Sequence, residues 1–161
     1  MVTLNRSLTV STPSDREIVL KRDFDAPREM VFKALSSSEH LRAWWGQKGS
    51  TVSVCEMDFR PGGAWRIVER DANGAEWGFR GEVREIKAPE RVVQTFEFEG
   101  MPGHISVETM VLEDIEGKTR MTVTSAFDSQ ADRDGMLQSG MEKGAGESYD
   151  RLEAYLATLA A

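Results

Sequence analysis

The stretch Ala64–Lys87, AWRIVERDANGAEWGFRGEVREIK, contains the clearest β-hairpin signal in the chain. Its central Asn73-Gly74 pair favours the tight turns that join antiparallel strands. On both sides of the turn, bulky apolar side chains alternate with Arg and Glu, which is typical of strands that bury one face. The pattern predicts two strands, residues 64–70 and 76–87, with their apolar residues turned toward a core.

Similar β-rich segments lie before and after this hairpin. They cover residues 51–59, 91–99, 104–114 and 118–127, and short turn sequences separate them. Short connections predict a six-stranded antiparallel meander. Phe96 indicates which face of its strand is apolar. In residues 104–114 two phases compete, one with Val107 and Val111 and the other with Met110 and Leu112, so the inward face of this strand stays open.

The remaining elements are one earlier strand and three helices. Residues 17–25 alternate as a strand, and Pro27 then favours the start of a helix that ends near Ser36. Ser36 and Glu39 resemble a capping box for a second short helix, which Gly46 would end. A single helix is predicted over 133–159, with one apolar stripe. The order β-α-α-β6-α predicts an α+β fold in which a curved antiparallel sheet wraps around the long last helix.

Composition limits the class of protein. The chain has 161 residues, about the size of one domain, and we expect a single domain over residues 1–161. The net charge of −7, without a basic run, argues against nucleic acid and anionic membranes as partners. No segment has the length of a membrane span or the pattern of a signal peptide, so we expect a cytoplasmic protein. With Cys55 as the single cysteine, we expect no disulfide, metal site or cofactor.

Several short motifs together resemble a known family, that of the activator of heat-shock protein 90 ATPase homologues, within the START and birch-pollen-allergen-like (SRPBCC) superfamily. The matching stretches are Phe24–Pro27 (FDAP), Leu41–Gly46 (LRAWWG), Asp58–Trp65 (DFRPGGAW), Phe79–Gly81 (FRG), Ser139–Ala145 (SGMEKGA) and Ser148–Leu152 (SYDRL). The resemblance implies the helix-grip fold. It also implies either binding of hydrophobic ligands, as in superfamily relatives, or a chaperone-related role in the stress response.

Our first hypothesis is a binding protein for a small apolar or aromatic molecule, held between the sheet and the last helix. Trp44 or Trp45 would lie near the cavity mouth, and Ser148, Gln94 or Thr109 would orient the ligand. The expected cavity residues are Trp44, Trp45, Trp65, Ile67, Trp77, Phe79, Phe96, Met141, Gly144, Ala145 and Ser148.

Two other functions stay open. The chain could be a chaperone cofactor that binds an ATPase partner through exposed elements. It could also be an enzyme of the polyketide-cyclase type, with Glu69 or Glu85 as an inward acid, although no catalytic motif is present and a binding role is favoured. The sequence decides neither the ligand nor whether the chain is a monomer or a homodimer.

Overall fold

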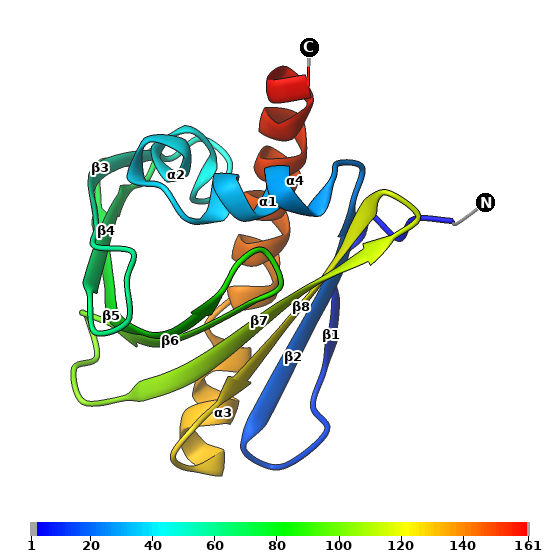
Figure 1. Ribbon diagram of the computed structural model, residues 1–161. Helices are drawn as coiled ribbons and strands as arrows, with labels where there is room; N and C mark the ends of the chain where they lie inside the picture. Colours follow the sequence, from blue (N-terminus) through cyan, green and yellow to red (C-terminus); the bar gives the residue numbers. More distant parts are fainter. Residues whose placement is uncertain (1–2, 161) are drawn as a thin grey trace.

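An eight-stranded antiparallel sheet curls around a long helix in the computed structural model, which describes residues 3–160 (Figure 1). The strand order in the sheet is β1-β2-β8-β7-β6-β5-β4-β3. The strands are β1 (Thr9–Ser11), β2 (Glu17–Phe24), β3 (Thr51–Met57), β4 (Ala64–Arg70), β5 (Glu76–Lys87), β6 (Arg91–Phe98), β7 (Ile105–Ile115) and β8 (Lys118–Ala126). The helices are α1 (Arg28–Leu35), α2 (Ser38–Trp44), α3 (Gln130–Gln138) and α4 (Met141–Ala160).

The predicted meander is confirmed, and long-range pairing completes the sheet. Strand β2 pairs with the last strand, β8, along its whole length, from Glu17 opposite Ala126 to Phe24 opposite Thr119. Irregular register in β3, between Val52 and Val54, and in β5 bends the strands locally. The bends and the natural twist of the strands give the sheet a concave face deep enough to hold helices.

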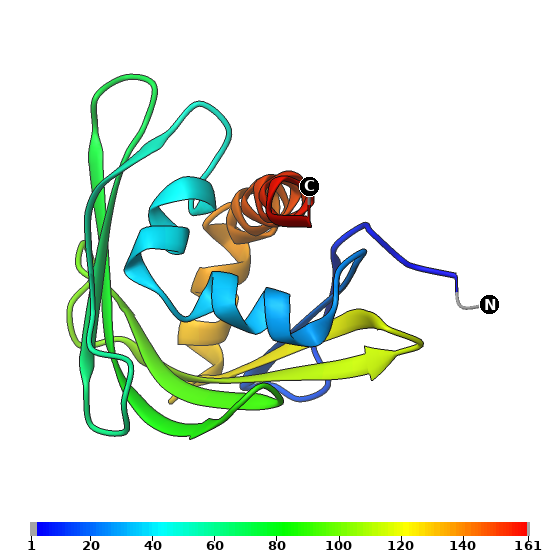
Figure 2. The same ribbon diagram turned by 45° about the horizontal axis from the view of Figure 1, so that its top comes forward.

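Helices α1, α2 and α4 lie inside the curve of the sheet (Figure 2). Their apolar faces meet the concave face in one core, which includes the fully buried Phe24, Val31, Trp44, Leu152 and Leu156. The Trp44 indole N–H donates to the Ala34 carbonyl at 2.9 Å, which ties α2 to α1. The helices and the concave face are therefore in contact, and the size of the side chains between them determines how much space is left.

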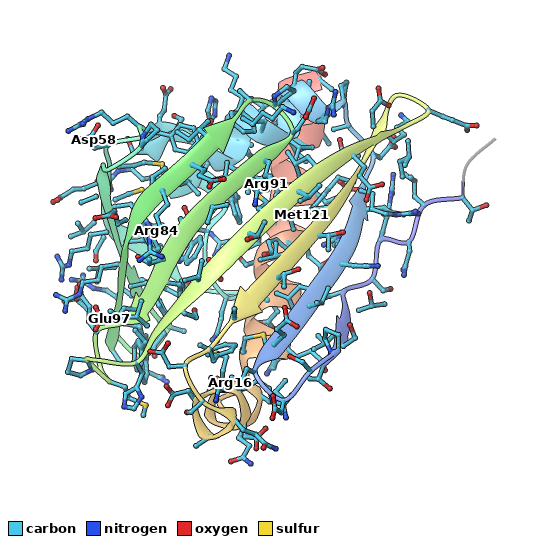
Figure 3. All side chains as sticks on the ribbon, turned by 60° about the horizontal axis from the view of Figure 1, so that its bottom comes forward. Arg16, Asp58, Arg84, Arg91, Glu97 and Met121 are labelled. Carbon is cyan, nitrogen blue, oxygen red and sulfur yellow. The ribbon has the colours of Figure 1, made fainter. Side chains whose placement is uncertain are left out.

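The convex face of the sheet is polar (Figure 3). Arg80 on β5 pairs with Glu97 on the neighbouring β6, and Arg66 on β4 reaches across β5 to pair with Glu99 just after the end of β6. Both arginines are exposed to solvent, and such surface pairs contribute at most about 1 kcal/mol each. The convex face therefore contributes solubility and strand register more than stability, and the apolar interactions of the fold are concentrated on the concave side.

The single helix predicted over 133–159 is wrong in one respect, because two helices occupy this segment. Helix α3 ends at Gln138, and Gly140 has a φ of +85°, in the left-handed region that ends helices. The apolar spacing continues across the break and so concealed it in the sequence. The capping box is also wrong, since Ser37 precedes α2 and its side chain makes no capping hydrogen bond.

No helix in the described part of the chain is long and apolar enough to cross a membrane.

Candidate functional site

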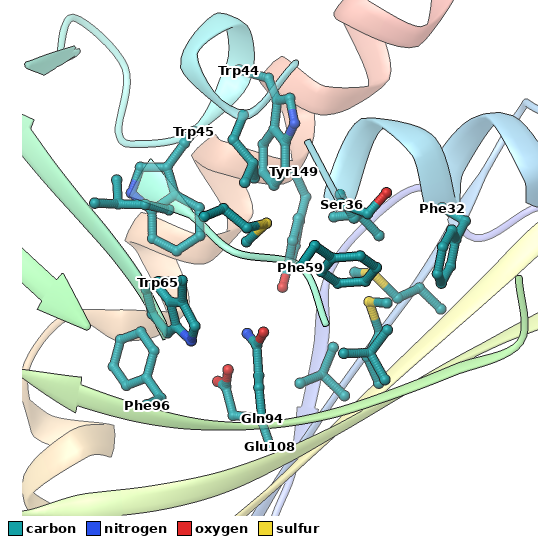
Figure 4. Close-up of a pocket in the computed structure, with 18 residues that line it drawn as sticks. Phe32, Ser36, Trp44, Trp45, Phe59, Trp65, Gln94, Phe96, Glu108 and Tyr149 are labelled. Carbon is teal, nitrogen blue, oxygen red and sulfur yellow. The ribbon is translucent and has the colours of Figure 1, made fainter. Parts of the chain in front are cut away.

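A cavity of about 120 Å³ lies between the concave face of the sheet and helices α1, α2 and α4 (Figure 4). Its floor comes from β4, β6, β7 and β8 and includes Ile67, Met110 and Val123. Trp44 and Trp45, from the end of α2, line the opposite wall. An engineered apolar cavity of about 150 Å³ can bind benzene, so this space suits a molecule built on one small ring.

Aromatic rings form most of the wall near β4 and β6. The ring centroids of Trp65 and Phe96 lie 6.0 Å apart, and the centroids of the Trp44 and Trp45 rings are separated by the same distance. The indole N–H groups of Trp45 and Trp65 are buried without a hydrogen-bond partner in the described part of the chain. Packing rather than hydrogen bonding therefore holds these two rings in place.

Two rings from opposite elements close one side of the cavity. Phe32 on α1 and Phe59 in the β3–β4 loop meet edge to face, with centroids 5.8 Å apart. Both side chains are only partly buried. This pair therefore forms the part of the lining contributed by α1 and the β3–β4 loop.

Three polar side chains project into this apolar space. Gln94 on β6 and Glu108 on β7 are directly paired across the two strands, and both line the cavity. The hydroxyl group of Tyr149, from α4, points toward them (Figure 4). The next strand, β8, places Ser125 opposite Glu108, with its Oγ 3.5 Å from Glu108 Oε2. The cavity thus has one polar end, and the rest of its lining is apolar apart from Ser36, whose hydroxyl donates to a backbone carbonyl group within α1.

The environment of Glu108 changes its acidity. Burial raises the pKa of this carboxyl to about 7, although hydrogen bonding by Gln94 and Ser125 favours the charged form and offsets part of the effect. Near neutral pH the carboxyl is therefore divided between its protonated and ionised forms. A bound molecule could meet it as either a hydrogen-bond donor or a negative charge.

Tyr149 stays protonated under the same conditions. Burial raises the pKa of its hydroxyl, and the nearby Glu108 carboxyl raises it further, while Arg22 acts in the opposite direction. Tyr149 therefore presents a neutral hydroxyl to the cavity throughout the ordinary pH range, and Glu108 is the group at this end whose charge changes.

The structure brings five of the predicted cavity residues to this space. They come from α2, the residue after it, and strands β4 and β6. Trp44 is fully buried rather than near a mouth, and Gln94 lines the cavity as expected for a polar contact. The five residues are Trp44, Trp45, Trp65, Ile67 and Phe96.

The prediction for β5 is wrong. Trp77 is 44% exposed near the turn between β4 and β5, where it stacks on Phe98 and donates its indole N–H to Asp71. Phe79 packs between Trp45 and Phe98 and does not line the cavity. Strand alternation correctly placed both rings in one phase but could not show that β5, although it lies between β4 and β6 in the sheet, contributes no residue to the cavity.

The predicted contribution of α4 is also wrong in detail. Ser148 is buried, and its Oγ accepts a hydrogen bond from the Gly46 backbone N–H at 3.0 Å, so it fixes the α2–β3 loop. Gly144 faces the Gln47 side chain of that loop. Met141 and Ala145 pack against the core outside the cavity. Thr109, on the opposite face of β7 from Glu108, does not line the cavity either.

Neither acid suggested for catalysis reaches the cavity. Glu85 is exposed and pairs with Arg91. Glu69 is buried, but its carboxylate accepts the Gln47 backbone N–H at 3.1 Å and lies beneath the α2–β3 loop. Cys55 is buried, burial raises the pKa of its thiol, and no metal-binding cluster occurs among residues 3–160. The two acids proposed for a cyclase activity, Glu69 and Glu85, therefore cannot act on a molecule in this cavity.

Glu108 and Tyr149 line the cavity but were not among the residues predicted from the sequence. Glu108 shares its phase with Met110 and Leu112, and choosing that phase for 104–114 would have turned the carboxyl inward. Tyr149 stands next to Ser148 on α4, one position from the predicted contact. Apolar residues on both faces of β7 obscured the inward position of Glu108. For Tyr149, the inward face of α4 differs by one residue from the face that was predicted.

The chain matches one protein family over most of its length. The family described as activator of Hsp90 ATPase homolog 1-like protein matches residues 25–157. Among curated proteins, none matches the chain.

Solved structures share the fold over almost the whole chain. A protein from Rhodobacter sphaeroides is 25% identical, with a TM-score of 0.88 over 94% of this chain and 99% of the other. A protein described as AHSA1 from Silicibacter pomeroyi is 26% identical, with a TM-score of 0.73 over 89% and 99% of the two chains. A Nitrosomonas europaea protein, 23% identical, has a TM-score of 0.82 over 92% and 99%.

The family match spans most of the chain, and the helix-grip arrangement of sheet and helix agrees with these structures. The chain therefore belongs to the family of activator of Hsp90 ATPase homolog 1-like proteins.

Proposed function

We propose that this protein binds a small, largely apolar molecule of about one ring in the cavity above β4, β6, β7 and β8. The observation that supports this most strongly is an apolar cavity of about 120 Å³ with polar groups gathered at one end. Ligand sites in proteins commonly combine an apolar lining with a few orienting polar groups. Gln94, Glu108 and Tyr149 would supply those groups here.

The expected affinity follows from burial. Aromatic side chains bury on the order of 150–250 Å², and a ring of this size gains about 25 cal/mol per Å² removed from water. This gives about 4–6 kcal/mol before the costs of association, so a simple ring should bind weakly, with a Kd of about 1 mM or above. A natural ligand that also uses the polar end should bind more tightly.

A cavity-filling variant tests the proposal. Val123 lines the cavity from β8, whereas Val111 lies in the opposite phase of β7 and outside the cavity. We expect calorimetry to detect toluene binding by the native protein and by Val111→Phe, and to detect none by Val123→Phe. A thermal melt checks that each variant is folded. Equal toluene binding by folded Val123→Phe, or no binding by the native protein, would contradict the proposal.

A second candidate function rests on the family description, which refers to an activator of the Hsp90 ATPase. Under this proposal the chain would bind that chaperone and raise its ATPase rate independently of the cavity. Steady-state ATP hydrolysis by Hsp90 from the same organism, with and without an excess of this protein, is the direct test. An unchanged rate together with no co-purification would reject it.

A further inference from the structure

The cavity contains one carboxyl group and no basic side chain. Glu108 is the only Asp or Glu among the described residues that line it, and none of these residues is Lys, Arg or His. The lining therefore favours a particular charge in a bound molecule. An anion would meet repulsion from ionised Glu108 and no compensating cation, whereas a cation would meet its only charged partner.

Glu108 has no ionic partner of its own. Its polar contacts are the neutral side chains of Gln94 and Ser125, and it takes part in no ion pair within residues 3–160. Arg22 is buried and acts electrostatically on Tyr149, but its Nη1 is 2.8 Å from Asp150 Oδ1 and its guanidinium stands over the Phe24 ring, with its Nε unpartnered among residues 3–160. Glu108 is therefore left without a cationic partner among residues 3–160, and the nearby Arg22 pairs with Asp150 instead.

We infer that the ligand class is a monocationic amine with a small apolar or aromatic body, whose ammonium group pairs with the Glu108 carboxylate. This inference rests on the proposed ligand-binding function of the cavity. The amine would lie beside Gln94, and the Tyr149 hydroxyl oxygen could accept one of its N–H groups. The apolar body would extend between Trp65 and the α2 tryptophans.

Two physical effects support a cation at this position. A charge-assisted hydrogen bond is roughly twice as strong as a neutral one, and the low dielectric of the cavity strengthens the attraction. The faces of aromatic rings also attract cations. Together these interactions oppose the cost of removing an ammonium group from water, which an apolar cavity without a carboxylate could not do.

Binding would be coupled to the release of a proton. An aliphatic ammonium arrives protonated, and the protonated fraction of Glu108 gives its proton to solvent as the ion pair forms. Because the pKa of Glu108 is about 7, its ionised fraction rises about tenfold between pH 6 and pH 8. Tyr149 remains neutral over this range, because its pKa is raised. The affinity for an amine should therefore rise close to tenfold over the same interval.

Three probes of nearly equal size separate charge from apolar burial. We expect the native protein at pH 8 to bind benzylamine at least tenfold more tightly than benzyl alcohol, and benzoate more weakly than either. In Glu108→Gln the preference for the amine over the alcohol should fall below twofold. Glu113→Gln removes the same charge from the opposite face of β7 and should keep the native preference.

The outcomes distinguish this inference from the proposal on which it rests. Benzyl alcohol bound as tightly as benzylamine, a stronger affinity for benzoate, or an amine preference that survives in Glu108→Gln would overturn the amine inference while leaving a ligand cavity. Failure of toluene and all three probes to bind the native protein would overturn both. Loss of the preference in Glu113→Gln would show that net charge, rather than the cavity carboxyl, attracts the amine.

Discussion

Gln94 and Glu108 lie side by side across β6 and β7, and both side chains enter the same apolar cavity. Strand pairing thus brings an amide and a carboxyl together 14 residues apart in the sequence. A polar pair within a buried sheet face reduces stability unless its hydrogen bonds are satisfied. Under the proposed ligand-binding function, a bound molecule would form further hydrogen bonds with this pair.

Replacing Glu108 by Gln should stabilise the protein at high pH and have a much smaller effect at low pH. The folded-state pKa of about 7 lies above the reference value of 4.5, so the native state holds its proton more tightly than the unfolded state. The associated stability is complete below about pH 4.5 and is lost as the pH rises through 7. The gain from Glu108→Gln should be larger at pH 8 than at pH 4.5 by about 2–3 kcal/mol.

Urea unfolding at the two pH values measures this difference, with Glu113→Gln as the control. Glu113 lies on the same strand but is exposed. If Glu108→Gln changes the free energy of unfolding equally at both pH values, the carboxyl is not buried as described.

Gly81 is required by the packing of Trp65. A Cβ at this position would stand 2.0 Å from the Thr95 carbonyl oxygen and 2.5 Å from Trp65 Nε1. Since backbone atoms of a central strand cannot move freely, Gly81→Ala should destabilise the protein by at least about 2 kcal/mol and displace the indole. Chemical unfolding and the fluorescence of the folded protein would report these two effects.

Gly78→Ala is the matched control on the same strand. A Cβ there would meet the Glu99 side chain, whose carboxylate would be 2.2 Å away but which can rotate toward solvent. We expect a loss below about 1 kcal/mol, the range of an exposed ion pair with Arg66. Equal losses in the two variants would argue against the tight contact between Gly81 and Trp65.

The break between α3 and α4 depends on Gly140. Because its φ is +85°, Gly140→Ala should cost about 1–2 kcal/mol. Gly146 lies inside α4, and a Cβ there would enter open space, so Gly146→Ala should stabilise the protein by up to about 1 kcal/mol. Opposite shifts in Tm are therefore expected. A gain in both variants would favour the uninterrupted helix that the sequence pattern predicted.

Local patterns were sufficient to predict most of the fold. The Asn73-Gly74 turn and strand alternation identified the β4–β5 hairpin with its observed bounds, and short connections identified the antiparallel meander. The pairing of β2 with β8 joins residues more than 90 positions apart, which no local pattern could reveal. The end of α3 was hidden because apolar spacing continued through Gly140.

The candidate site was less predictable because it depends on where the covering helices stop. Alternation placed Trp65 and Trp77 on one face, but only tertiary packing shows that one ring lines the cavity and the other lies outside it. Glu108 was concealed by a different ambiguity, since both faces of β7 carry apolar residues. A polar residue in an otherwise inward-facing row was the available signal for it.

The four tryptophans provide the most direct test of the ligand cavity. Their indole N–H groups give separate signals in a ¹H–¹⁵N correlation spectrum, which single Trp→Phe variants can assign. Trp44, Trp45 and Trp65 line the cavity, and Trp77 does not. On titration with toluene we predict that the first three signals shift together with one Kd while that of Trp77 stays in place. A shift confined to Trp77, or no shift at saturating toluene, would contradict the account.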